Sequence, residues 1–297
     1  MVKKTDFPNY YIAGDHISLI AQKLYTRYVR LDLLLMVLSA ALTIYNFQAN
    51  ESKKIIYIIS GFIMLIAIIL SLVIKNKKYE DIWYRGRALA ESAKTLTWRF
   101  MTKSEYFENT ITDKEAKIRF VNRMKELHEE FKDLHSSLKT ADLSLPMITD
   151  RMIKTRNYDL KDRKEFYLKN RIDNQIKWYS DKADSNKTKY ENWFWGVIVM
   201  QLLALISIGY LALNPESNFN FVGLFTTLSA SFFGWLQLKK YQENKEAYTT
   251  ATSELNLIKQ EAEYINTEEK FKIFVLDSEN AMSREHTLWL AQKGFSS

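Results

Sequence analysis

The sequence predicts an all-α membrane protein with two transmembrane helical hairpins, four spans in total, whose helices continue as long cytoplasmic coiled-coil-like segments. Three observations lead to this prediction. Uncharged, largely apolar runs occur as two close pairs that are separated by more than a hundred residues. Charged residues make up 26% of the chain, and they lie outside these runs. Turn-forming residues are scarce, with three prolines and eight glycines in 297 residues, which favours helices throughout.

The four apolar runs have the lengths that helical membrane spans require. They cover residues 33–50, 55–74, 192–215 and 217–238. Because an α-helix rises about 1.5 Å per residue, about 20 residues cross a hydrocarbon core of about 30 Å. Each run is therefore predicted to be one span, and each close pair is predicted to form a hairpin.

Lysine and arginine gather on one side of the predicted spans. The segments 75–103 and 161–189 are rich in both residues, whereas the loop 51–54 has two and the loop 216–220 has none. By the positive-inside rule, both termini and the middle of the chain face the cytoplasm. The net charge of +7 has two interpretations, namely attraction to anionic lipid head groups and recognition of an anionic ligand.

An internal repeat relates the two hairpins. A shift of 162 residues brings the Lys-Lys-Tyr triplet at 77–79 onto the same triplet at 239–241. The order of two spans, a basic exit and a long helix also recurs, which favours a duplication. We expect a first two-transmembrane unit with a basic cytoplasmic helix at 1–103, connecting cytoplasmic helices at 104–160, and a second two-transmembrane unit with a C-terminal coil and a terminal helix at 161–297.

Two cytoplasmic segments carry apolar residues three and four positions apart, as on one face of a helix. The first seam follows a capping box at Thr112 and Glu115. Its members are Phe120, Met124, Leu127, Phe131, Leu134 and Leu138, and those of the second seam are Tyr248, Ala251, Leu255, Ile258, Ala262 and Ile265. Such faces need partners, so they pack either inside one subunit or between the subunits of a symmetric oligomer.

The sequence carries no catalytic or metal-binding motif, so we expect no enzyme activity, no metal site and no cofactor. Cysteine is absent, which excludes thiolate ligands and a cysteine nucleophile. Of the four histidines, His128 and His135 stand seven apart, which we interpret as exposed helix positions too distant to share a metal. The glycines outside the apolar runs, Gly14, Gly86 and Gly294, form no phosphate-binding loop.

The fourth apolar run is distinguished by hydroxyl side chains, at Thr226, Thr227, Ser229 and Ser231. One interpretation is tight helix packing through small residues, with each hydroxyl bonded to a backbone carbonyl. The other is that several copies of this helix surround a pore and that these four hydroxyls line it.

Three cytoplasmic motifs resemble those of a known family. Residues 83–100 begin Trp-Tyr-Arg-Gly and end Trp-Arg-Phe, residues 151–179 include Arg-Ile-Asp-Asn-Gln before Trp-Tyr, and residues 278–289 include Ser-Arg-Glu-His. In this order around two hairpins, they resemble the SLATT family of two-transmembrane effectors, here as a tandem pair of units. The arginines of the first motif do not recur after the second hairpin, so ligand binding is expected in the first unit.

The resemblance implies a pore-forming effector, in effect an ion channel, of bacterial antiviral defence. It implies a multi-pass protein of the bacterial inner membrane that forms a symmetric homo-oligomer and halts the growth of an infected cell by membrane disruption. It further implies a cyclic or short linear oligonucleotide as the regulator and an associated nucleotidyltransferase as the partner that makes it. The alternative function is a non-conducting scaffold or sensor, anchored in the membrane, that recruits a cytosolic partner through its coils.

Basic and aromatic residues of the first two motifs are the candidate oligonucleotide contacts, because arginines pair with phosphates and aromatic rings stack on bases. The first set is Trp83, Arg85, Arg87, Lys94, Trp98 and Arg99, and the second set is Arg151, Arg156, Arg163 and Arg171. The same residues can instead form structural ion pairs or contact lipid.

Overall fold

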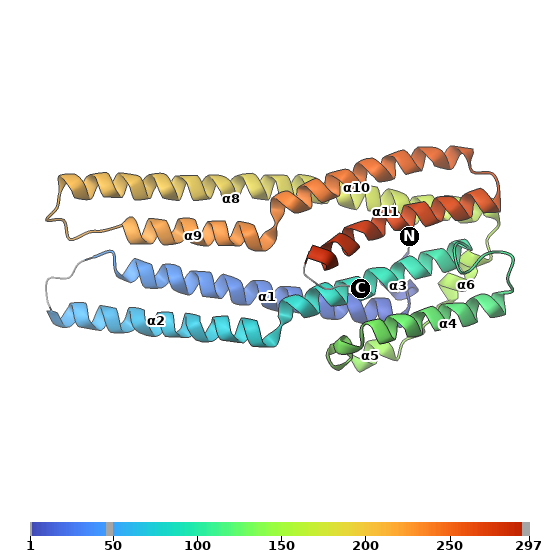
Figure 1. Cartoon of the computed structure of the whole chain (residues 1–297), viewed down its shortest axis with the longest axis horizontal. Helices are drawn as coiled ribbons and strands as arrows, with labels where there is room; N and C mark the ends of the chain where they lie inside the picture. Colours follow the sequence, from blue (N-terminus) through green and yellow to red (C-terminus); the bar gives the residue numbers. More distant parts are fainter. Residues whose placement is uncertain (1, 46–49, 293–297) are drawn as a thin grey trace. The chain divides into compact units, whose positions relative to one another are not determined.

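The computed structural model of the chain consists of helices (Figure 1). It describes residues 2–45 and 50–292, with side chains described as far as Ser283. The described helices are η1 (Lys4–Asp6), α1 (Asn9–Leu42), α2 (Asn50–Lys77), α3 (Tyr79–Thr102), α4 (Asp113–Glu130), η2 (Lys132–Ser137), α5 (Thr140–Leu143), α6 (Asp150–Arg156), α7 (Leu160–Tyr167), the π-helical turn η3 (Leu168–Ile172), α8 (Asp173–Leu213), α9 (Val222–Lys239), α10 (Tyr241–Glu261), η4 (Ala262–Tyr264) and α11 (Glu268–Gln292). The all-α prediction is confirmed.

Contacts divide the chain into two compact units. Unit 1 comprises Met1–Gln22, Glu80–Lys182 and Glu246–Ser297, and unit 2 comprises Lys23–Tyr79 and Ala183–Lys245. Unit 2 therefore holds all four apolar runs, whereas unit 1 holds both seams and most of the basic motifs.

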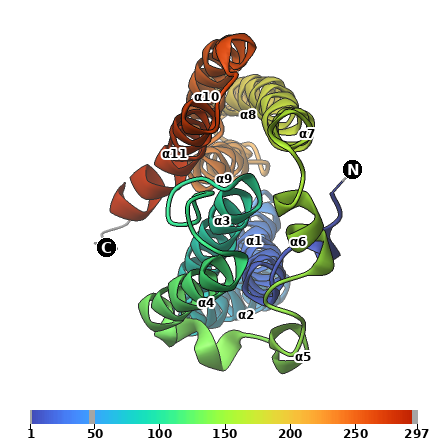
Figure 2. The same cartoon turned by 90° about the vertical axis from the view of Figure 1, so that its right-hand side faces the viewer.

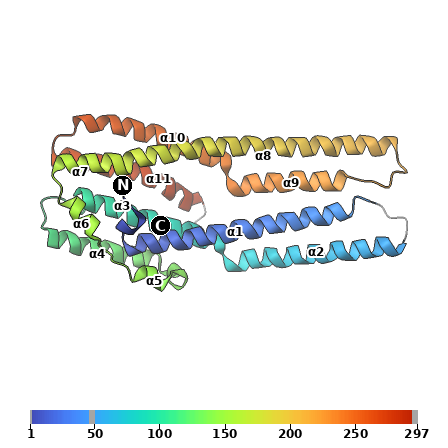
Figure 3. The same ribbon diagram turned by 180° about the vertical axis from the view of Figure 1, so that it is seen from behind.

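Unit 2 is built from two helical hairpins, visible from opposite sides in Figures 1 and 3. In the first hairpin, the hydroxyls of Ser39 in α1 and Ser60 in α2 lie 2.6 Å apart, and both residues are buried. In the second hairpin, the Ser229 hydroxyl of α9 donates to the Val197 carbonyl of α8 at 3.4 Å. Hydroxyls thus join the helices of each pair where apolar side chains dominate.

Two of the helices, α2 and α8, are long and apolar enough to cross a membrane. The most apolar 18-residue stretch of each lies within Glu51–Thr102 or Leu160–Leu213, with a mean hydropathy of 2.8 or 2.2. Only 11% of each stretch is buried in the chain. A helix in the core of a water-soluble protein would bury such a surface, so the exposure favours contact with lipid.

The other two helices are shorter than their apolar runs. Helix α1 ends at Leu42, so the run 33–50 is not helical to its end, and residues 46–49 lie outside the described chain. Helix α9 begins only at Val222, because the Ser217 hydroxyl accepts from the Phe219 amide and Asn220 accepts from the Val222 amide. These polar turn bonds replace the first helical turn that the run predicted.

The two hairpins of unit 2 contact each other at both ends. At the loop end, the Asn220 amide donates to the Ile44 carbonyl at 2.7 Å, and Tyr45 pairs with Phe219 in an isolated antiparallel bridge. At the other end, the Arg30 guanidinium lies 5.3 Å from the centre of the Trp235 ring. The hairpins therefore form one four-helix body.

The internal repeat extends to an unusual backbone conformation. Lys78 joins α2 to α3 with φ of 48°, and Lys240 joins α9 to α10 with φ of 46°. These two lysines occupy equivalent positions of the repeat. A left-handed conformation is uncommon for a residue with a Cβ atom, so its recurrence at both joints supports the duplication.

Helices α3, α4, α6 and α7, which contribute to unit 1, are labelled in Figure 2. The core of this unit is rich in aromatic residues, with Trp98, Phe100, Phe120, Tyr167 and Phe271 all buried. All six members of the first seam are buried, and four of the second are, namely Ala251, Leu255, Ala262 and Ile265. Both seams belong to this one core. The seams therefore pack inside one chain, as one of the two alternatives predicted.

The first seam does not lie on a single straight helix. Helix α4 ends at Glu130, and the 3-10 turn η2 carries the rest of the seam back toward it. As a result, the rings of His128 and His135 stack with their centres 3.8 Å apart, and the Tyr10 hydroxyl bonds to His128. The interpretation of these histidines as distant and exposed was wrong, because it assumed an unbroken helix.

Two glycines allow helices α1 and α3 to cross closely in unit 1. A Cβ atom on Gly14 would lie 2.9 Å from the Gly86 carbonyl oxygen and 3.0 Å from the Ala90 amide nitrogen. A Cβ atom on Gly86 would lie 3.0 Å from Ile17. Because the obstructing atoms are largely backbone, no side-chain rotation would relieve the clash.

Candidate functional site

A cluster of charged and hydroxyl groups is buried at the centre of unit 1. The Glu279 carboxylate of α11 accepts two hydrogen bonds from Arg171, at 2.9 and 2.7 Å. It also accepts from the Tyr167 hydroxyl and the Thr95 hydroxyl, each at 2.9 Å. Arg171 and Glu279 are almost fully buried. We refer to these four residues as the Glu279 cluster.

The π-helical turn η3 positions Arg171 in this cluster. A π turn holds one more residue than an α turn, and one residue corresponds to about 100° around a helix axis. The chain before η3 contributes Tyr167, and the turn itself contributes Arg171, so both side chains reach the same carboxylate. Helix α3 supplies Thr95 from the first half of the sequence.

Burial shapes the electrostatics of the cluster and its surroundings. Desolvation raises the pKa of Tyr167 well above its ordinary value, and the adjacent Glu279 charge raises it further. Burial alone would lower the pKa of Arg171, but the Glu279 charge and hydrogen bonds outweigh burial and raise it. Burial likewise lowers the pKa of Lys94, which the nearby Glu91 charge opposes. Arg171 therefore remains a cation, held by two hydrogen bonds to the Glu279 carboxylate.

The other arginines of the second set differ in their surroundings. Arg156 is buried, where it bonds to Asp113 at 3.0 Å and to the carbonyls of Phe100 and Phe107. Arg163 is buried beside Glu268 of α11 and donates to the Tyr158 carbonyl at 3.0 Å. Arg151 is half-buried, and its Nε has no hydrogen-bond partner among the described residues.

The residues of the first set lie along α3 and make contacts within the chain. Arg85 donates to Asp133 at 2.6 Å, and Arg87 lies 2.8 Å from Glu91, which also lies 3.5 Å from Lys94. Further along α3, Trp98 is buried in the core, and Arg99 donates to Glu105 and Asn280. The Trp83 ring stacks on Tyr84 with their centres 4.7 Å apart.

Arg151 borders a cavity of unit 1 with a volume of about 460 Å³. Its guanidinium lies 4.8 Å from the centre of the Phe166 ring, and the Tyr158 ring meets Phe166 edge-on at 5.9 Å. The remaining lining residues are Asp162, Glu165, Lys169, Asn170 and Asn174. We call this cavity the Arg151 groove.

The Arg151 groove combines groups that recognise a nucleotide. Aromatic faces and a guanidinium stack on bases, lysine and arginine pair with phosphate, and amides and carboxylates bond to base edges. The Asn170 and Asn174 amides each donate to the carbonyl four residues earlier, at 3.0 Å. Those bonds use the amide nitrogens and leave the side-chain oxygens able to accept.

Of the residues that line the Arg151 groove, only Arg151 was predicted from the sequence. Asp162, Phe166, Asn170 and Asn174 stand four residues apart, which places them on one face of a helix. That spacing was the signal available in the sequence. Their mixed polarity made the face resemble an ordinary solvated helix surface.

The four hydroxyls predicted to line a pore lie along α9. Thr226 donates to the Val222 carbonyl at 2.8 Å and Thr227 to the Gly223 carbonyl at 2.7 Å, so both bond within their own helix. Ser229 bonds across the hairpin to α8, and Ser231 is buried. Thr226 is the exposed member of the four. The pore-lining role stays a prediction.

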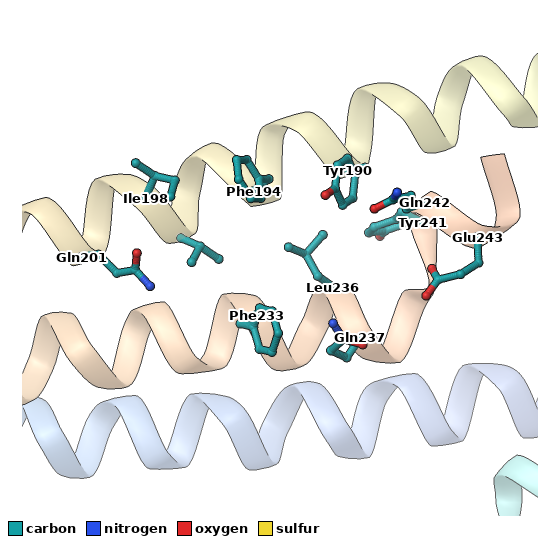
Figure 4. A pocket seen from close by; sticks show the side chains of 11 residues that line it. Tyr190, Phe194, Ile198, Gln201, Phe233, Leu236, Gln237, Tyr241, Gln242 and Glu243 are labelled. Atoms are coloured by element: carbon teal, nitrogen blue, oxygen red, sulfur yellow. The ribbon is translucent and has the colours of Figure 1, made fainter. Parts of the chain in front are cut away.

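A further cavity of about 300 Å³ lies between α8 and the joint of α9 with α10 (Figure 4). Gln201 of α8, Gln237 of α9 and Gln242 of α10 line it together with the aromatic residues Tyr190 and Tyr241. Its lining residues come from both sides of Lys240, the left-handed joint of the second repeat. A change at this joint would therefore alter the cavity.

Within the described part of the chain, no group of three or more histidine, aspartate or glutamate side chains is placed to hold a metal ion.

Comparison with known proteins identifies the two halves of the chain separately. Residues 8–164 match the model for SMODS and SLOG-associating 2TM effector domain 3, and residues 167–289 match that for SMODS and SLOG-associating 2TM effector domain 1. No curated protein and no solved structure matched the chain.

These two matches agree with the repeated hairpins and with the apolar helices of unit 2. The first match alone covers more than half of the chain. Such domains are membrane effectors associated with nucleotide-signalling defence systems. The chain belongs to the SLATT family and consists of two SLATT domains in tandem.

Proposed function

We propose that this protein is an oligomeric, pore-forming effector of a bacterial anti-phage defence system. An oligonucleotide messenger made by an associated nucleotidyltransferase would control it, and membrane disruption would halt the growth of the infected cell. The observation that carries the proposal is the exposed apolar surface of α2 and α8 in a chain of two SLATT effector domains. An effector that acts on the membrane requires such a surface.

The proposed topology has four spans, formed by α1, α2, α8 and α9, in the bacterial inner membrane. Large apolar side chains such as Phe62, Ile66 and Ile69 of α2 and Leu205 and Ile206 of α8 are exposed and would face lipid. The lysines at the ends of α2 and α9 would lie at the cytoplasmic surface, with both termini on that side.

Assembly of several copies would create the pore. A Cβ atom on Gly209, Gly223 or Gly234 would meet nothing within 4 Å, so these positions of α8 and α9 are open to another helix. Small residues let helices approach closely in membranes. Thr226 shares α9 with two of these glycines, and its exposed hydroxyl would be available to line a channel.

The Arg151 groove would bind the messenger. A base would stack on Phe166 and Arg151, Lys169 would pair with a phosphate, and Asp162 or Glu165 would accept from an exocyclic amino group. The buried arginines of the second set would hold the surrounding helices in position. Among the first set, Arg85 and Arg87 reach the surface and would contact a ligand longer than one nucleotide.

The left-handed joints at Lys78 and Lys240 would transmit ligand binding to the membrane. Each joint connects a predicted span to a cytoplasmic helix, and each is held in a sparsely populated conformation. A small change at such a joint redirects the helix that follows it. The two states of the channel would differ at these two residues.

Ion flux from liposomes that contain the purified protein tests the proposal. Flux is measured with and without a panel of cyclic and short linear oligonucleotides, for the wild type, for Arg151→Gln and for Lys154→Gln. Lys154 is exposed on the same helix, α6, and its substitution removes the same charge outside the groove. We expect one oligonucleotide to change the flux of the wild type and of Lys154→Gln at least tenfold more than that of Arg151→Gln.

The alternative, a non-conducting scaffold or sensor, is favoured by one observation. The hydroxyls of Ser39, Ser60, Thr226, Thr227 and Ser229 all bond within one chain. Such a scaffold would have to recruit its partner through a surface other than the two seams, because these are buried in unit 1. Inserted, oligomeric protein that conducts no ions with any oligonucleotide would support the scaffold and refute the pore.

A further inference from the structure

An apolar groove with a positively charged rim runs between the two hairpins of unit 2. Its volume is about 350 Å³, and its lining comes from α1, α8 and α9. Leu34 and Val37 of α1 face Leu228 and Phe232 of α9 across it, with Trp193 of α8 also contributing. In Figure 4, α1 lies along α9 on the side away from the glutamine-lined cavity, so the two cavities are separate.

One end of this groove carries positive charge and the other end is apolar. Arg30 and Trp235 lie at the charged end, whereas Val37 and Leu228 lie at the apolar end. Seven residues separate the two ends on each helix, which corresponds to about 10 Å along the helix axis. The groove is thus about two helical turns deep, with the Arg30 charge at its rim and the Ser231 hydroxyl as a polar group of its interior.

The rim gathers cations around one indole ring. The Arg30 guanidinium and the Lys239 ammonium lie 5.3 and 5.0 Å from the centre of the Trp235 ring. The charges that act on Lys239 come from Arg30 and Lys189, and both are positive. Among the described side chains, none of these three cations has an acidic partner within 4 Å. Within the described residues, no paired acid therefore balances their mutual repulsion.

We propose that this groove binds one anionic phospholipid of the cytoplasmic leaflet. The phosphate would lie between Arg30 and Lys239, and one acyl chain would lie along Val37 and Leu228. This inference rests on the proposed membrane topology, which puts Arg30, inside the long helix α1, and Lys239, the last residue of α9, at the cytoplasmic surface. The rim offers charge complementarity, and the dry interior offers the acyl chain a surface that water would not wet.

The identity of the occupant follows from the chemistry of the two ends. A free phosphate or nucleotide would use the rim and leave the apolar interior empty. A zwitterionic lipid would fill the interior but bring a second, positive charge to a rim that is already positive. An anionic phospholipid satisfies both ends. Because the groove joins α1 of the first domain to α9 of the second, such a lipid would also bridge the two hairpins.

Native mass spectrometry of the full-length protein in detergent tests the proposal. Three probes are titrated separately: phosphatidylglycerol, phosphatidylcholine of the same acyl chains, and glycerol 3-phosphate. We expect phosphatidylglycerol to bind at one site at least tenfold more tightly than either of the others. Equal binding of the two lipids would overturn the charge argument. Equal binding of glycerol 3-phosphate would overturn the role of the acyl chain.

Matched variants locate the site. Arg30→Gln combined with Lys239→Gln removes two charges from the rim, and Lys75→Gln combined with Lys77→Gln removes two exposed charges at the end of α2. Phosphatidylglycerol binding should fall at least tenfold in the first variant and less than twofold in the second. Val37→Trp fills the groove, leaves its charges in place and should also weaken binding tenfold. Equal losses in both double variants, or none with Val37→Trp, would refute the site.

The outcome is separable from the proposed function. Lipid binding is measured on protein in detergent and needs neither conductance nor an oligonucleotide. Ligand-controlled flux in a protein that shows no lipid preference would remove the lipid site and leave the pore. A specific lipid site in a protein without flux would support the lipid site and refute the pore.

Discussion

Replacing Glu279 by alanine removes the shared acceptor of the Glu279 cluster and should destabilise unit 1 severely. Four hydrogen bonds end on this carboxylate, two from Arg171 and one each from Tyr167 and Thr95. Breaking a buried ion pair by removing one partner costs about 3–5 kcal/mol, because the other charge stays buried without compensation. For a chain of this size, that loss corresponds to a fall in melting temperature of roughly 10 °C.

Replacing Arg171 by alanine should cost less, and its cost should depend on pH. A buried carboxylate that loses its cation can take up a proton and remain hydrogen-bonded to Tyr167, whereas a guanidinium stays charged in any protein. Proton uptake becomes easier as the pH falls. The penalty of Arg171→Ala should therefore shrink between pH 8 and pH 5, while the penalty of Glu279→Ala stays constant over the same range.

Thermal unfolding in a mild detergent, followed by scanning fluorimetry at pH 5 and pH 8, measures both penalties. Trp98 contacts Tyr167 edge-on with ring centres 5.6 Å apart, so indole fluorescence reports on this region. Arg119→Ala is the control, because it breaks an exposed ion pair with Glu115 and should cost less than about 1 kcal/mol. Losses no larger than that of Arg119→Ala, or equal pH dependence of the two cluster variants, would refute the reasoning.

Three other predictions concern the backbone and titration of the chain. Gly14→Ala should lower the stability of unit 1 by about 1–3 kcal/mol in the same assay, because its Cβ would meet backbone atoms, whereas Gly61→Ala should leave stability unchanged or raise it slightly, since its Cβ would meet nothing. Lys78→Gly should stabilise the protein by about 0.5–1 kcal/mol by relieving a left-handed lysine, whereas Lys77→Gly, in the last turn of α2, should destabilise it. A loss of stability with Lys78→Gly as well would show that the joint is unstrained. Burial, reinforced by Asp15 and Glu91, raises the pKa of Tyr11 to about 12. The unfolded chain ionises this tyrosine near pH 10 and the folded chain near pH 12, so folding stability should fall by about 2–3 kcal/mol across that interval, and Tyr11→Phe should reduce the fall measured by alkaline unfolding.

Elements with a simple periodicity could be predicted from the sequence. The apolar runs predicted the hairpins of unit 2. The three-and-four spacing of the seams predicted a packed helix face, and its residues, such as Phe120 and Leu255, are buried. Predictions failed where polar side chains compete with the helix. The side chains of Ser217 and Asn220 hold the turn that precedes α9, so the helix begins late. The 3-10 turn η2 interrupts the first seam at a point that no proline or glycine marks.

The candidate site was harder to predict, because charge in a sequence does not distinguish a ligand contact from a structural pair. Arg151, Arg156 and Arg163 look alike in the sequence. Their surroundings differ through partners more than 40 residues away, such as Asp113 for Arg156 and Glu268 for Arg163. Contacts between residues far apart in the chain decide that Arg151 borders a cavity and has an Nε without a hydrogen-bond partner among the described residues. A single sequence does not reveal such contacts.

The contacts of unit 1 suggest why the two SLATT domains are joined in one chain. Glu279 and Arg171 belong to the second matched domain, whereas Thr95, Gly14 and Gly86 belong to the first. The core of unit 1 therefore contains one carboxylate that binds groups from both domains, rather than two equivalent clusters. The Arg151 groove also draws Arg151 from the first domain and Phe166, which precedes the second match by one residue, from the junction. Within the described residues, the fused pair has one Arg151 groove. In the oligomer proposed above, one such groove would therefore serve two unequal hairpins.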